Sequence, residues 1–166
     1  MGPGYLLALA ETVRGATRRH GAKLLVNDRA DVALAVGADG VQRTYLSLPT
    51  SALRRIAPPG FLVGASVHSL AQAREAVDEG ADFVVFGPIY DTLSKRQYGA
   101  PQGLGALEQV AAASSRPVIA VGGITPQRVA EVRGAGAAGI AVISAIYAAA
   151  SPGDRTRAFL DALGRA

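Results

Sequence analysis

The chain has 166 residues, 49% of them hydrophobic and none of them Cys, with 17 Lys and Arg against 13 Asp and Glu. This length suits one domain, 1–166, with a buried core, and the missing thiols exclude disulfides, thiolate catalysis and Cys-based metal sites. The net charge of +4 comes from Arg residues scattered among acidic ones. A nucleic-acid binder concentrates its positive charge on one face, so we expect an anionic small molecule and no nucleic acid as partner.

Strand-like and helix-like segments alternate along the chain. The predicted helices cover about 5–20, 31–35, 49–56, 70–78, 104–113, 126–133 and 154–163, and the predicted strands 24–26, 40–42, 61–66, 82–86, 117–121 and 140–143. Apolar strands that alternate with helices favour a parallel sheet covered on both faces. We therefore predict an α/β fold, a TIM-type (β/α) barrel with about six of its eight βα units and a truncated N-terminus. An open sheet, or one completed in a homo-oligomer, is the alternative.

Neither a secretory signal nor a membrane segment is predicted. Met1-Gly2-Pro3-Gly4 has no basic residues before the first apolar stretch, and no run of about 18 apolar residues follows. We expect a cytoplasmic protein with no membrane partner.

A glycine-rich stretch has the G-x-G-x-x-G spacing of the dinucleotide-binding fingerprint: Gly134-Ala135-Gly136-Ala137-Ala138-Gly139. In that fingerprint the glycines follow a strand and begin a helix. Here they would end a helix and precede a strand, so the order favours a turn over a nucleotide site.

Two strand ends predict a phosphate site. Gly122-Gly123 lies between a predicted strand and a helix that begins at Pro126 with Thr125 as its cap. Glycines let backbone N–H groups approach an anion, and a helix N-terminus adds partial positive charge. Ile143-Ser144 ends the next strand, and the last two βα loops bind phosphate in many barrels. The alternative is that both segments are merely tight turns.

The loop after Phe86 runs some 17 residues, which is long for a compact domain. It contains Thr92, Ser94, Lys95 and Arg96, whose hydroxyls and cations suit phosphate oxygens. The alternative is an ordinary solvated loop.

Two further strand ends carry polar side chains. Asn27-Asp28 offers an amide and a carboxylate to a ligand or to Mg²⁺, although Asp28 could equally cap the following helix. His68, just before the helix capped by Ser69, could titrate near neutrality, but a structural hydrogen bond at the helix entry is the preferred interpretation.

Together these segments resemble the thiamine phosphate synthase and TenI (thiazole tautomerase) superfamily. The resemblance runs from Leu24-Leu25-Val26-Asn27-Asp28-Arg29 through Phe86-Gly87-Pro88-Ile89-Tyr90, Thr92-x-Ser94-Lys95 and Gly122-Gly123-Ile124-Thr125 to Val142-Ile143-Ser144-Ala145-Ile146. It implies joining of hydroxymethylpyrimidine diphosphate to thiazole phosphate with release of pyrophosphate, a magnesium-assisted transferase reaction of thiamine biosynthesis.

The resemblance also implies a role for each matching residue. Lys95 and Ser66 would be catalytic, Lys95 with Asn27 at the pyrophosphate and Ser66 near the reacting pyrimidine. Asp28 would bind Mg²⁺. The thiazole phosphate would be bound by the following groups: Thr92, Ser94, and the backbone at Gly123, Ile143 and Ser144.

Three positions depart from the family pattern. Gln42 replaces the synthase His, Ser47 replaces its second magnesium carboxylate, and Pro88 replaces the catalytic His of the tautomerase branch. The family strand with a Gln-x-Arg-x-Lys group has no counterpart. The alternatives to a synthase are therefore a TenI-like thiazole phosphate tautomerase and a non-catalytic thiazole or thiamine phosphate-binding protein.

Overall fold

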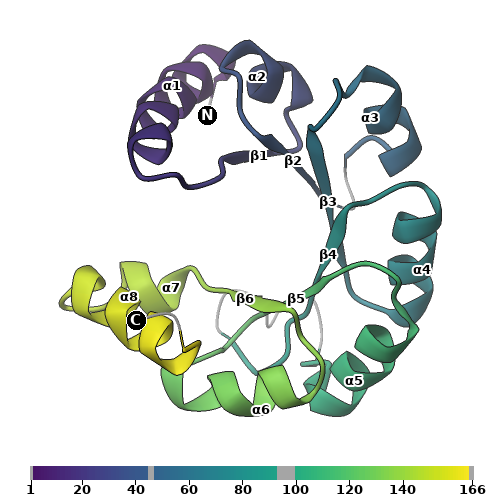
Figure 1. Ribbon diagram of the computed structural model, residues 1–166, viewed down its shortest axis with the longest axis vertical. Coiled ribbons are helices and arrows are strands. Elements are labelled where there is room, and N and C mark those ends of the chain that lie inside the picture. The colour runs from purple at the N-terminus through teal and green to yellow at the C-terminus, as the bar shows by residue number, and fades with distance from the viewer. Residues whose placement is uncertain (1, 45–46, 93–99, 165–166) are drawn as a thin grey trace. The chain divides into compact units, whose positions relative to one another are not determined.

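The computed structural model describes residues 2–44, 47–92 and 100–164, in which strands and helices alternate (Figure 1). They form two compact units. The first contains Met1–Ser66 and Asp78–Asp82, and the second contains Val67–Val77 and Phe83–Ala166.

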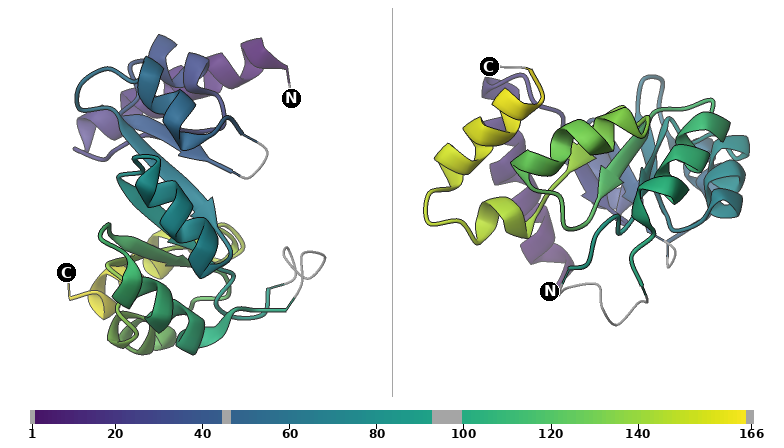
Figure 2. Two further views of the ribbon diagram at one scale, coloured as in Figure 1. Left: turned by 90° about the vertical axis from the view of Figure 1, so that its right-hand side faces the viewer. Right: turned by 90° about the horizontal axis from the view of Figure 1, so that it is seen from below.

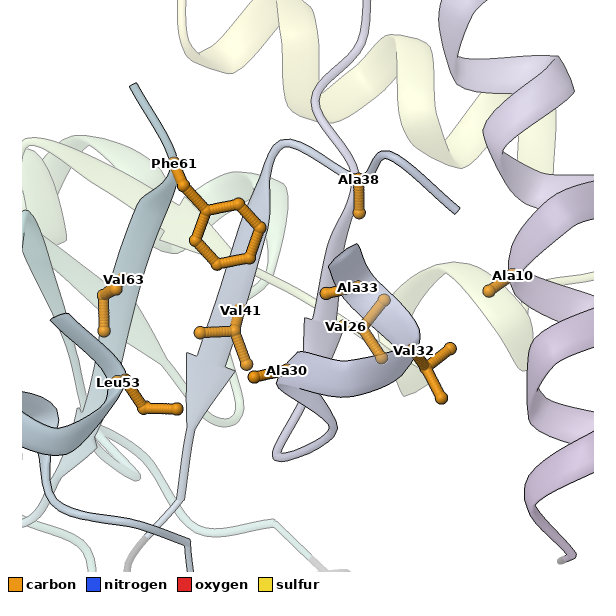
Figure 3. Close-up of a cluster of buried hydrophobic side chains, with 10 residues drawn as sticks. All are labelled: Ala10, Val26, Ala30, Val32, Ala33, Ala38, Val41, Leu53, Phe61 and Val63. Atoms are coloured by element: carbon orange, nitrogen blue, oxygen red, sulfur yellow. The ribbon is translucent and has the colours of Figure 1, made fainter. Parts of the chain in front are cut away.

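The first unit has three parallel strands in chain order. Its elements are α1 (Pro3–Arg19), β1 (Leu25–Asn27), α2 (Ala30–Ala35), β2 (Gly40–Arg43), α3 (Thr50–Ile56) and most of β3 (Leu62–Val67). Val26, Val41 and Val63 stand opposite one another in the register and are buried. Figure 3 shows these side chains with Ala30 of α2 and Leu53 of α3, so this face of the sheet packs against the helices.

Asp39 connects α1 to the strands of the first unit. Its carboxylate accepts from the Leu24 N–H at 2.9 Å, from Arg14 at 2.6 Å and from Lys23 at 3.0 Å. The Leu24 amide, with Lys23 and Arg14, lowers the pKa of Asp39 to about 2. The helix, the turn and the start of β1 therefore depend on one charged side chain.

The second unit repeats the same plan with β4, β5 and β6, again parallel and in chain order. Its elements are α4 (Leu70–Asp78), β4 (Phe83–Phe86), α5 (Gly103–Ala113), β5 (Val118–Val121), the 3₁₀-helix η2 (Pro126–Arg128), α6 (Val129–Gly134), β6 (Gly139–Ala141), α7 (Ser144–Tyr147) and α8 (Pro152–Ala162). Val84, Phe86, Val118 and Ala120 are buried on neighbouring strands. The C-terminal helix α8 packs on α6 and α7 (Figure 2).

The sequence predicted every strand of both units to within a few residues, but four details differ in the structure. Thr125 makes no side-chain cap bond, and its helix begins as the 3₁₀ turn η2. The last strand ends at Ala141, and the unpredicted helix α7 begins two residues after Val142.

The glycine-rich stretch is a turn, as predicted. Helix α6 ends at Gly134, Gly136 has a φ of +90°, and β6 begins at Gly139. Among the described residues, no helix has both the length and the apolar character needed to cross a membrane.

Candidate functional site

The Gly122-Gly123 pair follows β5 and lies against the segment that follows β4. The φ angles are +101° and +64°, in the region that favours glycine. A Cβ on Gly122 would lie 2.6 Å from the Cβ of Pro88, and one on Gly123 would lie 2.7 Å from the Cβ of Tyr90. Both positions therefore require glycine for conformation and for space.

The turn at the glycine pair has two backbone donors without an acceptor among the described residues. Gly122 O accepts from the Tyr90 N–H at 3.1 Å, and Gly123 O accepts from Arg128 at 2.7 Å. The N–H groups of Gly123 and Ile124 donate to no acceptor in the part of the chain that the structure describes. Free N–H groups just before a helix suit an anion.

The other predicted phosphate ligands of the second unit come from adjacent strand ends. Thr92 follows Asp91, whose carbonyl oxygen would lie 2.8 Å from a Cβ on Gly123. Val121 of β5 and Ala141 of β6 are register partners. Gly123 comes two residues after Val121, and Ile143 comes two residues after Ala141, so both follow neighbouring strand ends at the same level. Ile143 is 70% exposed and precedes Ser144, the first residue of α7. Ser94 and Lys95 lie outside the described residues.

In the first unit, Asn27, Gln42 and Ser66 lie on the sheet face opposite Val41. Asn27 and Gln42 are register partners, and Gln42 Nε2 donates to Ser66 Oγ at 2.9 Å. Asn27 is exposed, and its side chain has no partner among the described residues. A free amide and a serine hydroxyl held by an amide are thus available at this face.

Asp28 does not cap α2, so that alternative is wrong. Its φ is +60°, and its two carboxylate oxygens accept from the Thr44 N–H at 2.7 Å and from the Thr44 hydroxyl at 3.0 Å. The carboxyl is exposed and each oxygen keeps a lone pair, so it can still accept a hard cation. Within the described ranges, no three His, Asp or Glu side chains gather as a metal site. One carboxylate together with substrate phosphates is a donor set that Mg²⁺ accepts.

His68 makes the expected structural hydrogen bond at the entry to α4. Its backbone N–H donates to Gln72 at 2.7 Å, and its ring Nδ1 lies 2.5 Å from Gly87 O. Because a carbonyl oxygen can only accept, Nδ1 carries a proton, so the remaining ring nitrogen, Nε2, is not used by this bond.

Three residues near the glycine pair escaped sequence reasoning. Tyr90 OH donates to Glu131 at 2.5 Å, and the Arg128 guanidinium lies 4.1 Å from the centroid of the Tyr90 ring. Burial, with the Glu131 carboxylate, raises the pKa of Tyr90 to about 12. No local pattern in the sequence indicated that Tyr90 would contact Arg128 and Glu131, because Glu131 is 41 residues away.

Residues 3–146 match the family described as Thiamine monophosphate synthase. The chain belongs to the thiamine monophosphate synthase family. It is 50% identical over 160 residues to the Thiamine biosynthesis bifunctional protein ThiM/ThiE of Symbiobacterium thermophilum, and 52% identical over 141 residues to a Thiamine-phosphate synthase of Methanoculleus marisnigri. These matches confirm the predicted family.

A solved thiamine phosphate pyrophosphorylase from Pyrococcus furiosus, 35% identical, superposes on 99% of the chain with a TM-score of 0.91. This likeness confirms the predicted α/β fold of the TIM-barrel type. A 3-hexulose-6-phosphate synthase of Salmonella typhimurium, 18% identical with a TM-score of 0.74, shares the fold. The chain spans 33% of the length of the Symbiobacterium protein, 67% of the Methanoculleus protein and 78% of the Pyrococcus chain.

Proposed function

We propose that the chain is a thiamine-phosphate synthase that acts on hydroxymethylpyrimidine diphosphate and thiazole phosphate. The observation that carries the proposal is that the Gly123 and Ile124 N–H groups have no acceptor within the described ranges, in a chain related to thiamine-phosphate synthases. In the reaction, the C–O bond to the diphosphate breaks and its electron pair leaves with pyrophosphate. The thiazole nitrogen then donates its lone pair to the pyrimidine methylene carbon.

The second unit is proposed to bind the thiazole phosphate. The backbone N–H groups at Gly123, Ile143 and Ser144 would donate to phosphate oxygens, with the hydroxyls of Thr92 and Ser94. Backbone donors that are already oriented stabilise an anion without reorganising during the reaction. This supports phosphate-ester binding as the best-founded part of the proposal.

The pyrimidine diphosphate is assigned to Asn27, Ser66 and Lys95. The Asn27 amide has no partner in the part of the chain that the structure describes and would donate to a phosphate oxygen. Lys95 would offset the charge that develops on the leaving pyrophosphate. Gln42 fixes the Oγ of Ser66 as an acceptor, so the Ser66 hydroxyl proton is free to donate to the pyrimidine. Residues 1–166 would act as one synthase-like domain with phosphorylated small molecules as partners.

Mg²⁺ is the cofactor that this reaction implies, and Asp28 would hold it. The ion would neutralise diphosphate charge when bound. Thr44 orients both oxygens of Asp28, so removing its hydroxyl should weaken cation binding without removing the ligand. In this proposal, Thr44→Val raises the Mg²⁺ concentration needed for half-maximal turnover, whereas Asp28→Asn raises it further.

The direct test mixes both substrates with Mg²⁺ and measures thiamine phosphate. Lys95→Ala should abolish product, whereas Lys23→Ala, the only other lysine of the chain, should retain it. Binding of thiazole phosphate without turnover in the wild type would contradict the synthase and support a non-catalytic binding protein.

A thiazole phosphate tautomerase is the second candidate, favoured by His68. Pro88 occupies the position of the tautomerase histidine, but the His68 ring bonds to the neighbouring Gly87 O, and its Nε2, which that bond does not use, would act as the base. If this candidate is right, the wild type exchanges the labile ring proton of thiazole phosphate with D₂O but forms no thiamine phosphate, and His68→Gln loses that exchange. Unchanged exchange in His68→Gln would exclude it.

A further inference from the structure

Tyr90 and Arg128 bind the two carbonyls of the glycine pair, and Glu131 binds the Tyr90 hydroxyl. These three residues are here called the Tyr90 clamp. The backbone N–H of Tyr90 donates to Gly122 O, and Arg128 donates to Gly123 O at 2.7 Å. Both contacts lie within the second unit.

The members of the clamp also hold one another. The Arg128 guanidinium lies over the Tyr90 ring at 4.1 Å from its centroid, a cation–π contact. The Tyr90 hydroxyl donates to Glu131 at 2.5 Å, one turn of helix after Arg128. The loop after β4 is thereby joined to the start of α6, and the glycine pair lies between them.

Fixing a carbonyl also fixes the N–H of the next residue. The Gly122–Gly123 and Gly123–Ile124 peptide bonds are trans and planar, so each C=O and the N–H that follows it point in opposite directions. The clamp therefore sets the directions of the Gly123 and Ile124 N–H groups. Both of these groups lack an acceptor among the described residues.

We propose that the Tyr90 clamp is a positioning device that aims the Gly123 and Ile124 N–H groups at a phosphate monoester. Glycines with positive φ would otherwise sample several peptide orientations, and that freedom would have to be lost on binding. The inference rests on the proposed function for its ligand class, but it concerns binding and not turnover.

The chain offers a matched control. Arg133 donates to Ala138 O at 2.7 Å, the same kind of bond over the same five-residue separation, at the far end of α6. Arg128→Ala and Arg133→Ala remove equivalent side chains, and only the first removes a contact with the glycine pair.

The experiment titrates inorganic phosphate and then thiazole phosphate into ¹⁵N-labelled protein and follows the Gly123 and Ile124 amides by NMR. In the wild type and in Arg133→Ala both amides should shift with the same dissociation constant to within about twofold. Arg128→Ala should weaken binding about five- to tenfold, the effect of one lost hydrogen bond. Arg128→Lys should recover only part of this loss, since an ammonium lacks the planar stacking group.

Tyr90→Phe provides a test that does not depend on how Arg128→Ala folds. It keeps the ring under Arg128 and removes only the bond to Glu131, so a smaller weakening of about two- to fivefold is expected. Equal binding by the wild type, Arg128→Ala and Tyr90→Phe would overturn the inference. So would equal weakening by Arg133→Ala, or no shift of the two amides in the wild type.

Turnover distinguishes this inference from the proposed function. If phosphate binds as described but no thiamine phosphate forms, the proposed synthase function is contradicted and the positioning role of the clamp is supported. If product forms and the KM for thiazole phosphate is unchanged in Arg128→Ala, the positioning role of the clamp is contradicted and the proposed synthase function is supported. A raised KM for thiazole phosphate, with the KM for the pyrimidine diphosphate unchanged, supports both.

Discussion

Gly122 combines two demands that no other residue type meets. Its φ is +101°, and a Cβ would lie 2.6 Å from Pro88 Cβ and 2.7 Å from Pro88 Cα, a backbone atom. Because the obstacle includes backbone, the strain cannot be relieved by turning a side chain. The glycine pair is thus needed for the fold as well as for any ligand.

Gly122→Ala should lower the free energy of unfolding by about 1–3 kcal/mol, from backbone strain and overlap. Gly105→Ala is the control, because Gly105 lies in α5 with open space around it, and there alanine should stabilise by about 0.5–1 kcal/mol. Urea unfolding of both variants measures the difference. Equal stability of Gly122→Ala and wild type would contradict this account.

The Tyr90 hydroxyl should make stability depend on pH in the alkaline range. Its folded pKa is about 12, above the usual 10, so the folded state holds the proton more tightly than the unfolded chain. The stabilisation is complete below pH 10 and is lost as pH rises through 12.

Tyr90→Phe removes this dependence. The stability difference between wild type and Tyr90→Phe, measured by urea unfolding between pH 8 and pH 12, should therefore shrink as pH rises. A difference that stays constant over that range would show that Tyr90 ionises alike in both states.

The sequence identified Gly122-Gly123 and the loop after Phe86, but not how they contact each other. The Tyr90 hydroxyl bonds to a residue 41 positions away, and no local pattern encodes such a pair. The bond between Asp28 and Thr44 was likewise unpredicted, because the cap and metal hypotheses considered only neighbours of Asp28. The sequence thus identified candidate polar residues, but not their hydrogen-bond partners, which the fold brings together from distant positions.

At the scale of elements, strands and long helices were predictable because each repeats a pattern over several residues. Ser69 caps α4 as predicted, with the Gln72 N–H donating to its hydroxyl at 3.2 Å. Helix α7 was missed because its four residues, Ser144–Tyr147, are too few to show periodicity. Thr125 failed as a cap because η2 closes its first turn with the Arg128 N–H bonded to Thr125 O at 2.9 Å.

The attachment of α1 depends on Asp39, and Asp39→Asn tests it. The change removes charge-assisted bonds to Arg14 and Lys23, so unfolding free energy at pH 7 should fall by about 1–3 kcal/mol. Because the folded pKa is lowered to about 2, the stabilisation is present above about pH 4 and is lost as pH falls through 2. Wild type and variant should therefore converge in stability at low pH.

Asp31→Asn is the matched control for this prediction. The pKa of Asp31 is also lowered to about 2, but its partner Arg29 is two residues away and Asp31 is exposed, with 64% of its side chain accessible. Exposed pairs contribute little, so a smaller loss than in Asp39→Asn is expected at pH 7. Equal losses in both variants would contradict the role given to Asp39.

At the scale of the whole molecule, a ligand that binds only the folded state stabilises the entire chain. Thiazole phosphate at about 100 times its dissociation constant should add about 2.7 kcal/mol. For a chain of this size, that corresponds to a rise in Tm of roughly 5–10 °C.

The unphosphorylated thiazole alcohol is the control ligand for this measurement. It lacks the group that the Gly123 and Ile124 N–H groups are proposed to bind, so it should raise Tm far less at the same concentration. Calorimetric scans with each ligand make the comparison. Equal shifts would show that the ring, and not the phosphate, supplies the binding energy.

Two backbone bonds close the base of the loop after β4. Gln102 N–H donates to Pro88 O at 2.8 Å, and Gly103 N–H donates to Ile89 O at 3.1 Å. Since the cost of closing a loop grows only slowly with its length, residues inserted between Thr92 and Gln102 should cost little stability and leave Tyr90 at the glycine pair. The two anchored ends thus separate what the fold requires, at Pro88 and Ile89, from what the ligand requires at Ser94 and Lys95 in the proposed function.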